Sequence, residues 1–423
     1  MTRTHARRPA LAAFVLTVAA AVVWPAALAA QPTPSPVGQG GKPAPLRAAP
    51  PDDDVFAEAR TLDEGAAAQW KASATTALEL DPTDRGAAVR AMAVALAAGR
   101  PGEAATLYRS WASAAGRDDA ALLDHVAVAT LAALDSAPTG DLRTRALEAR
   151  AAFGDADARR LLETRAKSGE GAERIHAEGA LARLGDRGAA AAVAARAVET
   201  SGSNRLGSLE ALRGLPATPE VLSALEKALR GDDPMLQGRA SDIAAEMKAA
   251  SLVPALRQVM AGSRYGAPLR AAAALTVMKD PAGTKRAEEA LQQQLPDIRL
   301  IAARALATTR STTWVAAIEP ILEDPNPIWQ VEAAGLLLER GSPAATRVLQ
   351  QSMASPNPVV RDEAMRVLAA HSTTPLAVLA AALSDDSPTV RLLAATSVRR
   401  LATKPTVPVR PKAPARPPAG RRR

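Results

Sequence analysis

Apolar residues recur with a helical period along most of the chain, in pairs of short stretches that are separated by polar turns. The segment TPLAVLAAALSDDSPTVRLLAATSVRRL, residues 374–401, shows the pattern. It predicts a first helix that ends near Ser384 and a second that begins near Pro388. Proline in the first turn of a helix costs no helical hydrogen bond and presets φ, so Pro388 is a start signal.

This pair of helices is repeated along the chain. The second helix of each copy begins with an Arg-x-x-Ala pattern or a close variant, and successive copies lie 29 to 33 residues apart. The pattern starts at Arg143, Arg174, Arg205, Gln237, Arg270, Arg299, Gln330, Arg361 and Arg391. One helix pair cannot bury its own apolar faces, but stacked pairs form a continuous core. The sequence therefore predicts an all-α fold, an α-solenoid of stacked helix pairs.

The recurring arginines are interpreted as structural anchors. They are Arg143, Arg174, Arg205, Arg270, Arg299, Arg361 and Arg391, and Asp, Asn or Glu usually stands shortly before them. A catalytic residue has no reason to recur once per repeat of a solenoid. Asp386 and Arg391 are therefore expected to belong to the scaffold.

Two stretches resemble HEAT-like repeats, in particular the short repeats named after phycobilisome lyases. ALARLGDRGAA at 180–190 is similar to that family's turn between repeats, and SPNPVVRDEAMRVLAA at 355–370 to its second helix. The resemblance covers 141–403. It implies a superhelix in which Arg braces the turn between the two helices of a repeat, and its members share no single activity.

The segment 52–140 resembles degenerate tetratricopeptide repeats. ALELDP at 77–82 is similar to the end of one repeat, and GRPGEAATLYRSW at 99–111 supplies the small residue and the aromatic residue of the next. Met92 and Gly116 depart from that family's preferences. The resemblance implies a helical cap at the N-terminal end of the solenoid.

Composition agrees with helix-on-helix packing. Of 423 residues, 48% are hydrophobic but only 2% are aromatic, so the core must consist of Ala, Leu, Val and Met. The net charge of +8 belongs to the two ends of the chain, since residues 30–403 hold 42 basic and 44 acidic residues. The folded part is therefore not a basic nucleic-acid-binding domain, and no nucleic acid is expected as a partner.

The first 29 residues have the pattern of a signal peptide. Arg3, Arg7 and Arg8 precede the apolar run 11–23, and Ala27-Leu28-Ala29 forms a small-residue cleavage site. The run is short for a bilayer span, although an uncleaved anchor is the alternative. The Pro/Gly-rich segment 30–51 is interpreted as a linker. We expect an exported protein, periplasmic or secreted, with no transmembrane segment in the mature chain.

The chain contains few residues that could form a catalytic or metal-binding site. It contains no cysteine, which excludes disulfides, thiolate zinc sites and thiol nucleophiles. After loss of His5, three histidines remain, His125, His176 and His371, each on a separate helical segment. Metalloprotease, serine hydrolase, phosphate-loop and dinucleotide motifs are absent. The sequence predicts no catalytic residue, metal or cofactor.

The scarce aromatic residues suggest candidates for partner binding. Trp314, on a first helix, and Arg264-Tyr265, in the longest interval, are proposed as exposed anchors, since Trp, Tyr and Arg dominate binding hot spots. Trp329 occupies the position of Val360 and Val390 in neighbouring repeats, so it is assigned to the core.

Residues 404–423 form a basic, Pro-rich tail that is interpreted as disordered. Proline recurs at every third position from Pro405 to Pro417, the period of polyproline II. The basic residues are Lys404, Arg410, Lys412, Arg416, Arg421, Arg422 and Arg423. The tail either aids solubility or docks on an anionic partner such as an envelope polymer.

The sequence thus predicts a non-enzymatic scaffold in the bacterial envelope that mediates protein–protein interaction. Its concave face, lined by the second helices of nine repeats, would bind another protein along a curved body about 70–90 Å long. One alternative is an accessory or regulatory subunit of an envelope enzyme complex. The other, implied by the resemblance, is a phycobilisome lyase-like activity that modifies a chromophore or an enzyme.

Overall fold

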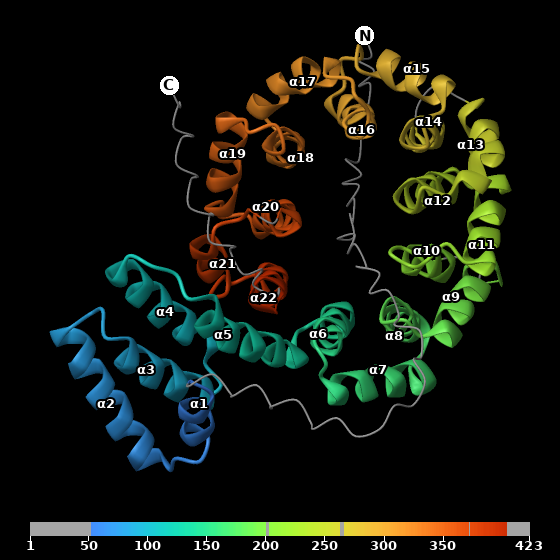
Figure 1. Ribbon diagram of the computed structural model, residues 1–423. Helices are drawn as coiled ribbons and strands as arrows, with labels where there is room; N and C mark the ends of the chain where they lie inside the picture. Colours follow the sequence, from blue (N-terminus) through green and yellow to red (C-terminus); the bar gives the residue numbers. More distant parts are fainter. Residues whose placement is uncertain (1–51, 200–202, 263–265, 372, 404–423) are drawn as a thin grey trace, which may run out of the picture.

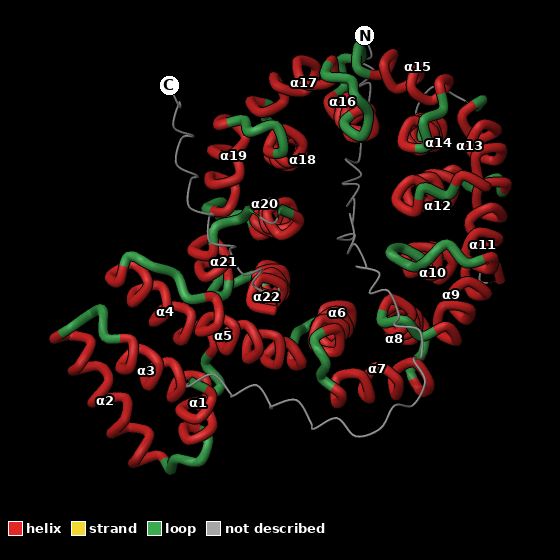
Figure 2. The backbone as a smooth tube through the Cα atoms, in the orientation of Figure 1, coloured by secondary structure: helices red, strands yellow, loops and turns green. Residues whose placement is uncertain are grey.

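The computed structural model describes residues 52–199, 203–262, 266–371 and 373–403, and Figure 2 shows these as helices and loops without a strand. The first helices are α1 Asp53–Ala59, α2 Glu64–Leu80, α3 Arg85–Ala97, α4 Pro101–Ala115, α5 Ala120–Ala133 and η1 Leu134–Ser136. The next are α6 Gly140–Ala152, α7 Ala156–Ser168, α8 Gly171–Arg183, α9 Arg187–Glu199, α10 Ser203–Ala211, α11 Pro219–Arg230, α12 Pro234–Met247, η2 Ala250–Leu252 and α13 Val253–Met260. The last are α14 Ala267–Val277, α15 Pro281–Ala290, α16 Pro296–Leu306, α17 Thr313–Ile318, η3 Glu319–Glu323, α18 Pro327–Leu338, α19 Pro343–Met353, α20 Pro358–Ala370, α21 Leu376–Ala382 and α22 Pro388–Thr403.

Helices α6 to α22 form a ring of two layers (Figure 1). The even-numbered helices lie in the inner layer, seen end-on, and the odd-numbered helices surround them. Among the described residues the inner layer holds nine helices, and each contains one of the nine repeat positions. The fold is the all-α solenoid that the sequence predicts, and its second helices line the concave side.

Helix starts follow the expected signals. Asp233, Asn326 and Asn357 cap α12, α18 and α20, where each side chain accepts a hydrogen bond from a backbone N–H of the first turn. A proline follows each cap at the first helical position. The repeated turn sequences therefore position the inner helices.

Small residues bring the two layers together. The alanine three positions after the anchor is fully buried in most repeats, as in Ala146, Ala302 and Ala364. At Gly283 in α15, a Cβ atom would lie 2.4 Å from Cβ of Leu275 in α14, so only glycine permits this approach. The low aromatic content thus follows from closely packed helices.

The ends of the solenoid meet. Helix α22 packs against α5, and residues of both helices share one hydrophobic cluster (Figure 1). Seven consecutive residues of α22, 392–398, are buried, as expected of a helix covered on every side. The sequence predicts a curved body but not its closure, in which the curvature of nine pairs returns the last helix to the N-terminal helices.

One polar contact accompanies this closure. Arg399 Nη1 donates to Asp124 Oδ2 at 2.5 Å, across 275 residues of chain. The Arg399 guanidinium also lies 4.8 Å from the ring centroid of Phe153. Burial raises the pKa of Asp124, and the charge of Arg399 opposes that rise.

Helices α1 to α5 pack beside the ring at the closure, and α6 begins next to the boundary expected at 140/141. Arg85 joins this region by ion pairs with Asp52 at 2.6 Å and Asp119 at 2.8 Å. Tyr108 and Trp111 of the tetratricopeptide-like segment are buried. Its relation to that family stays a prediction.

The inner helices end in a recurring turn in which the residue in the left-handed conformation is usually glycine. Gly154, Gly185 and Gly341 have this conformation, and the next N–H bonds to a carbonyl five residues back. Lys248 and Lys279 take the same place, with φ of 50° and 64°. A left-handed conformation costs an L-residue about 1–2 kcal/mol, whereas a cation at a helix C-terminus gains only about 0.3–1 kcal/mol. The fold alone would favour glycine at both positions.

Candidate interaction surfaces

The anchor side chains of five repeats hold the turn before the inner helix. Arg143, Gln237, Gln330, Arg361 and Arg391 each donate to the carbonyl oxygen six residues earlier, at 2.6–3.1 Å. Because a glutamine makes the same bond in two repeats, the shared feature is a donor that reaches a turn carbonyl. This is the geometry expected of a brace.

The remaining anchors make other contacts. Arg174 donates to Glu178 at 3.0 Å, Arg270 to Asp242 at 2.6 Å, and Arg299 to the carbonyl of Ala317 at 2.9 Å. Arg205 is half-buried, and its Nε has no partner among the described residues. Arg361 also forms a double hydrogen bond with Asp385. Asp386 accepts from Arg391 only through its backbone carbonyl.

Arg391→Gln is expected to retain nearly full stability, whereas Arg391→Ala is expected to lose about 1–2 kcal/mol. Glutamine can reach the carbonyl of Asp385 as Gln330 reaches its own turn, but alanine leaves the carbonyls of Asp385 and Asp386 without this donor. Urea unfolding of both variants measures the difference. Equal losses would contradict the brace.

Ion pairs join neighbouring inner helices. Arg183 of α8 pairs with Glu148 of α6 at 2.6 Å, and Arg304 of α16 with Glu332 of α18 at 3.2 Å. Arg239 of α12 likewise pairs with Glu210 of α10. These three pairs neutralise their own charges, so they give the described part of the inner layer no field of one sign.

Exposed apolar side chains gather at the N-terminal ends of the inner helices, which we call the turn edge (residues 230–235, 292–297, 323–328, 354–359 and 383–388). Met235, Leu295 and Val359 are 58%, 56% and 55% exposed. Among the described residues three other large hydrophobic residues are exposed, so half of the six lie at this edge: Met235 and Val359 at the second position of α12 and α20, and Leu295 at the N-cap of α16. Because they recur at one edge in alternate repeats, the turn edge is a candidate interaction surface.

The turn edge is also acidic. Its exposed carboxylates are Asp232, Asp233, Asp297, Glu323 and Asp386. Among the described residues of the turn edge, the exposed basic residue is Arg230, which pairs with Glu226 at 2.8 Å. A partner that docks here should therefore carry apolar and basic side chains.

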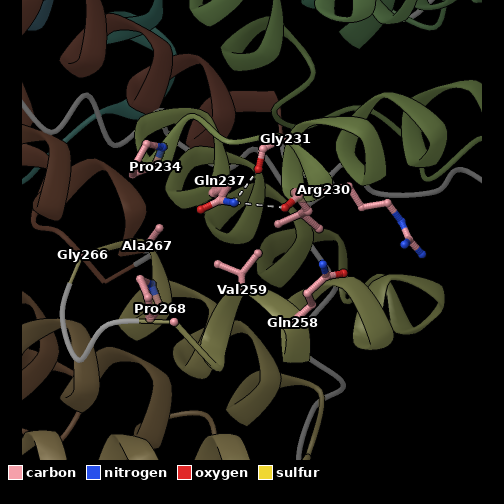
Figure 3. Close-up of a pocket in the computed structure, with 11 residues that line it drawn as sticks. Arg230, Gly231, Pro234, Gln237, Gln258, Val259, Gly266, Ala267 and Pro268 are labelled. Atoms are coloured by element: carbon pink, nitrogen blue, oxygen red, sulfur yellow. Dashed lines mark hydrogen bonds between the residues drawn. The ribbon is translucent and has the colours of Figure 1, made fainter.

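An open pocket of about 340 Å³ lies on this edge, between the turns that precede α12 and α14 (Figure 3). Val259 and Pro268 line it, and Gln237, which also lines it, donates to the carbonyl of Gly231. It is shallow and lacks a charged cluster, which suits an apolar side chain of a partner better than a substrate.

One residue that was predicted to bind a partner is buried in the structure. Trp314 is 1% exposed, donates to the carbonyl of Ser311 and lies under the guanidinium of Arg340, so its assignment as an exposed anchor was wrong. Its amphipathic ring is large enough to fill a gap in an Ala-rich core. Trp329 is half-buried against that core.

Other predicted residues lie outside the described part of the chain. They are Arg264, Tyr265, Lys404, Arg410, Lys412, Arg416, Arg421, Arg422 and Arg423. The signal-peptide and linker segments lie outside it as well.

The histidines lie apart. His125 stacks on Phe56 at 4.1 Å between ring centroids, His176 lies 3.5 Å from Asp141, and His371 follows α20. Among the described residues no group of His, Asp and Glu could hold a metal ion, and no helix is long and apolar enough to cross a bilayer.

Acidification is expected to weaken the N-terminal helices through His125. Burial lowers its pKa although Asp53 lies 3.4 Å away, so the unfolded chain takes up a proton before the native one. Stability is then lost as the pH falls below about 6.5. His125→Phe should keep the stacking and remove the part of the stability loss between about pH 7 and pH 5 that His125 causes, measured by urea unfolding. His176→Phe is the control, and equal pH profiles for wild type and His125→Phe would contradict the assignment.

Comparison with known proteins supports the repeat assignment. The family of HEAT repeats matches residues 284–369, from α15 to α20, so this part of the chain is similar to HEAT repeats. No curated protein matches. A crystal structure of an engineered protein from the Northeast Structural Genomics Consortium aligns over 83% of this chain and 98% of its own, with 17% identity and a TM-score of 0.30.

Proposed function

We propose that this HEAT-like repeat protein is an exported, non-enzymatic scaffold that binds another protein at the turn edge. The observation that carries the proposal is the recurrence of Met235, Leu295 and Val359, exposed at one edge of three different repeats. HEAT repeats are protein-interaction scaffolds in general, which supports the class of function.

The chemistry of the edge defines the partner. A segment with apolar side chains could contact the exposed residues and enter the pocket beside Pro268, while its basic side chains would pair with Asp232 and Asp297. Complementary charge would speed the encounter, and burial of the apolar residues would supply most of the affinity.

Photo-crosslinking in cells tests this surface. A photoreactive residue replaces Met235, Leu295 or Val359 in separate variants, and Val128 or Leu161 in matched controls, which are 45% and 46% exposed elsewhere. We expect one protein to be crosslinked from all three edge positions and from neither control. The same adducts from every position, or none from the edge, would reject the turn edge as the docking site.

Export is proposed from the N-terminal pattern, with Ala30 as the first residue of the mature chain. N-terminal sequencing of the protein from the envelope fraction should begin at Ala30. Intact Met1 in a cytoplasmic fraction would contradict export without affecting the turn edge.

An accessory subunit of an envelope enzyme would use the same surface, and the crosslinked partner would identify it. The phycobilisome lyase-like alternative rests on the resemblance alone. Incubation of the purified protein with a bilin and its acceptor should give no covalent product.

A further inference from the structure

The opposite edge of the ring carries cations. Lys248, Lys279, Arg310 and Arg340 follow the inner helices α12, α14, α16 and α18, one per repeat in four consecutive repeats, and all four are exposed. We call them the basic edge. Since every unit repeats the same order of helices, the inner helices run parallel and these residues lie on the face of the ring opposite the turn edge.

Neighbouring carboxylates do not neutralise this edge. Asp280 is buried and paired with Arg257 at 2.7 Å, and Glu246 is paired with Arg213. Next to a residue of the basic edge in sequence lies one exposed carboxylate, that of Glu339, which precedes Arg340. Lys248, Lys279 and Arg310 have no carboxylate within 4.0 Å among the described residues.

Packing does not explain the two lysines. Both adopt the left-handed conformation that Gly154, Gly185 and Gly341 adopt in the equivalent turns of other repeats. The backbone would be more stable with glycine, so a lysine here keeps a charge at the expense of backbone conformation. This favours a use for the charge outside the fold.

The shape of the edge indicates a flat partner. Neighbouring inner helices pack about 8–10 Å apart, so four cations that follow successive inner helices form an arc about 30 Å long on one face of the ring. The arc lies away from α1 to α5, which pack beside the ring at the closure (Figure 1). Helix α22 ends at this same face with Thr403, and the chain continues with seven basic residues and no acidic one.

We infer that the basic edge is a docking surface for an anionic lipid bilayer. A planar arc of separate charges matches the plane of phosphate headgroups, whereas a nucleic acid strand would require a continuous groove of charges. Among the described residues of the inner layer, Arg183, Arg239 and Arg304 are paired with glutamates of neighbouring helices and do not form such a groove. Docking in this way would turn the acidic, apolar turn edge away from the membrane.

Vesicle sedimentation tests the inference with the chain that begins at Ala30, which keeps every described residue. Vesicles containing phosphatidylglycerol should bind the protein, and vesicles of phosphatidylcholine alone should not. Each cation near an anionic surface contributes about fivefold in affinity, so Lys248→Gly/Lys279→Gly should weaken binding about 25-fold. The control Lys167→Gln/Arg230→Gln changes exposed residues near the turn edge and should bind like wild type.

The glycine substitutions separate binding from folding. The melting temperature of Lys248→Gly/Lys279→Gly should equal or exceed that of wild type, because glycine adopts the left-handed conformation of these turns without strain. A variant ending at Thr403 measures how much residues 404–423 contribute to vesicle binding. Lys248→Gly/Lys279→Gly should weaken the vesicle binding of that shortened variant as well. Unchanged binding of the lysine variant, equal loss in the control, or equally tight binding of single-stranded DNA with the same dependence on the lysines would overturn the inference.

Discussion

Leu131→Asp is expected to open the ring. Leu131 is 1% exposed in α5, two turns from Asp124 on the same helix face, and it belongs to the cluster that joins α5 to α22. A carboxylate buried there without a partner costs on the order of 3–4 kcal/mol. The contact should be lost.

The rest of the solenoid should survive this change. Repeats contact mainly their neighbours, so α7 to α20 keep their packing when the two ends separate. Small-angle scattering should show a larger radius of gyration with little loss of helical circular dichroism. Ala395→Glu, which places a charge on the α22 side one turn from Arg399, should have the same effect.

A crosslink measures the closure directly, because the chain contains no natural cysteine. Asp124→Cys/Arg399→Cys should be joined by a short bismaleimide, and the closed loop of 275 residues should change the mobility on a denaturing gel. Leu131→Asp should abolish this product, and the control Val128→Asp, at an exposed position of α5, should not. Unchanged crosslinking and scattering in Leu131→Asp would mean that the ring does not depend on this contact.

The repeats could be predicted from the sequence because their determinants are local. A turn, a proline and an anchor side chain lie within about six residues of each other, as from Asp385 to Arg391. Helix pairing then follows from the apolar faces. The family match over 284–369 and the inner layer of even-numbered helices agree with this prediction.

Closure could not be predicted in the same way. Closure depends on a small rotation between successive repeats that accumulates over nine pairs, and no single residue determines the accumulated rotation. One signal was available, since LLAATSV at 392–398 is apolar or uncharged where α20 has Asp362, Glu363 and Arg366. A helix without a polar face must be covered on both sides.

The interaction surfaces were missed for a related reason. Large aromatic residues were considered as anchors, but in an Ala-rich core Trp314 fills space. The exposed Met235 and Val359 look like ordinary members of an apolar run, and only their common place at one edge distinguishes them. Lys248 and Lys279 appear normal in sequence, and only their left-handed conformation reveals that they replace glycine.

Arg213→Ala is expected to cause the largest loss among the ion pairs between inner helices. The Arg213 side chain is only 5% exposed, donates to Glu210 at 3.2 Å and pairs with Glu246 of α12. Glu210 keeps Arg239 as a partner at 3.1 Å, but Glu246 would remain half-buried with no counter-ion. Removing one partner from a buried pair costs about 3–5 kcal/mol, and we expect about 3 kcal/mol because Glu246 is partly exposed.

The matched control is Arg230→Ala. Arg230 pairs with Glu226 at 2.8 Å within one exposed helix face, where such a pair contributes less than about 0.5 kcal/mol. Urea unfolding should therefore separate two arginines that both pair with glutamate. Arg213→Met should lose less than Arg213→Ala, since it fills the same space and leaves only the charge uncompensated. Equal midpoints for Arg213→Ala and Arg230→Ala would show that burial does not decide the strength of these pairs, and that α10 and α12 are joined by apolar packing alone.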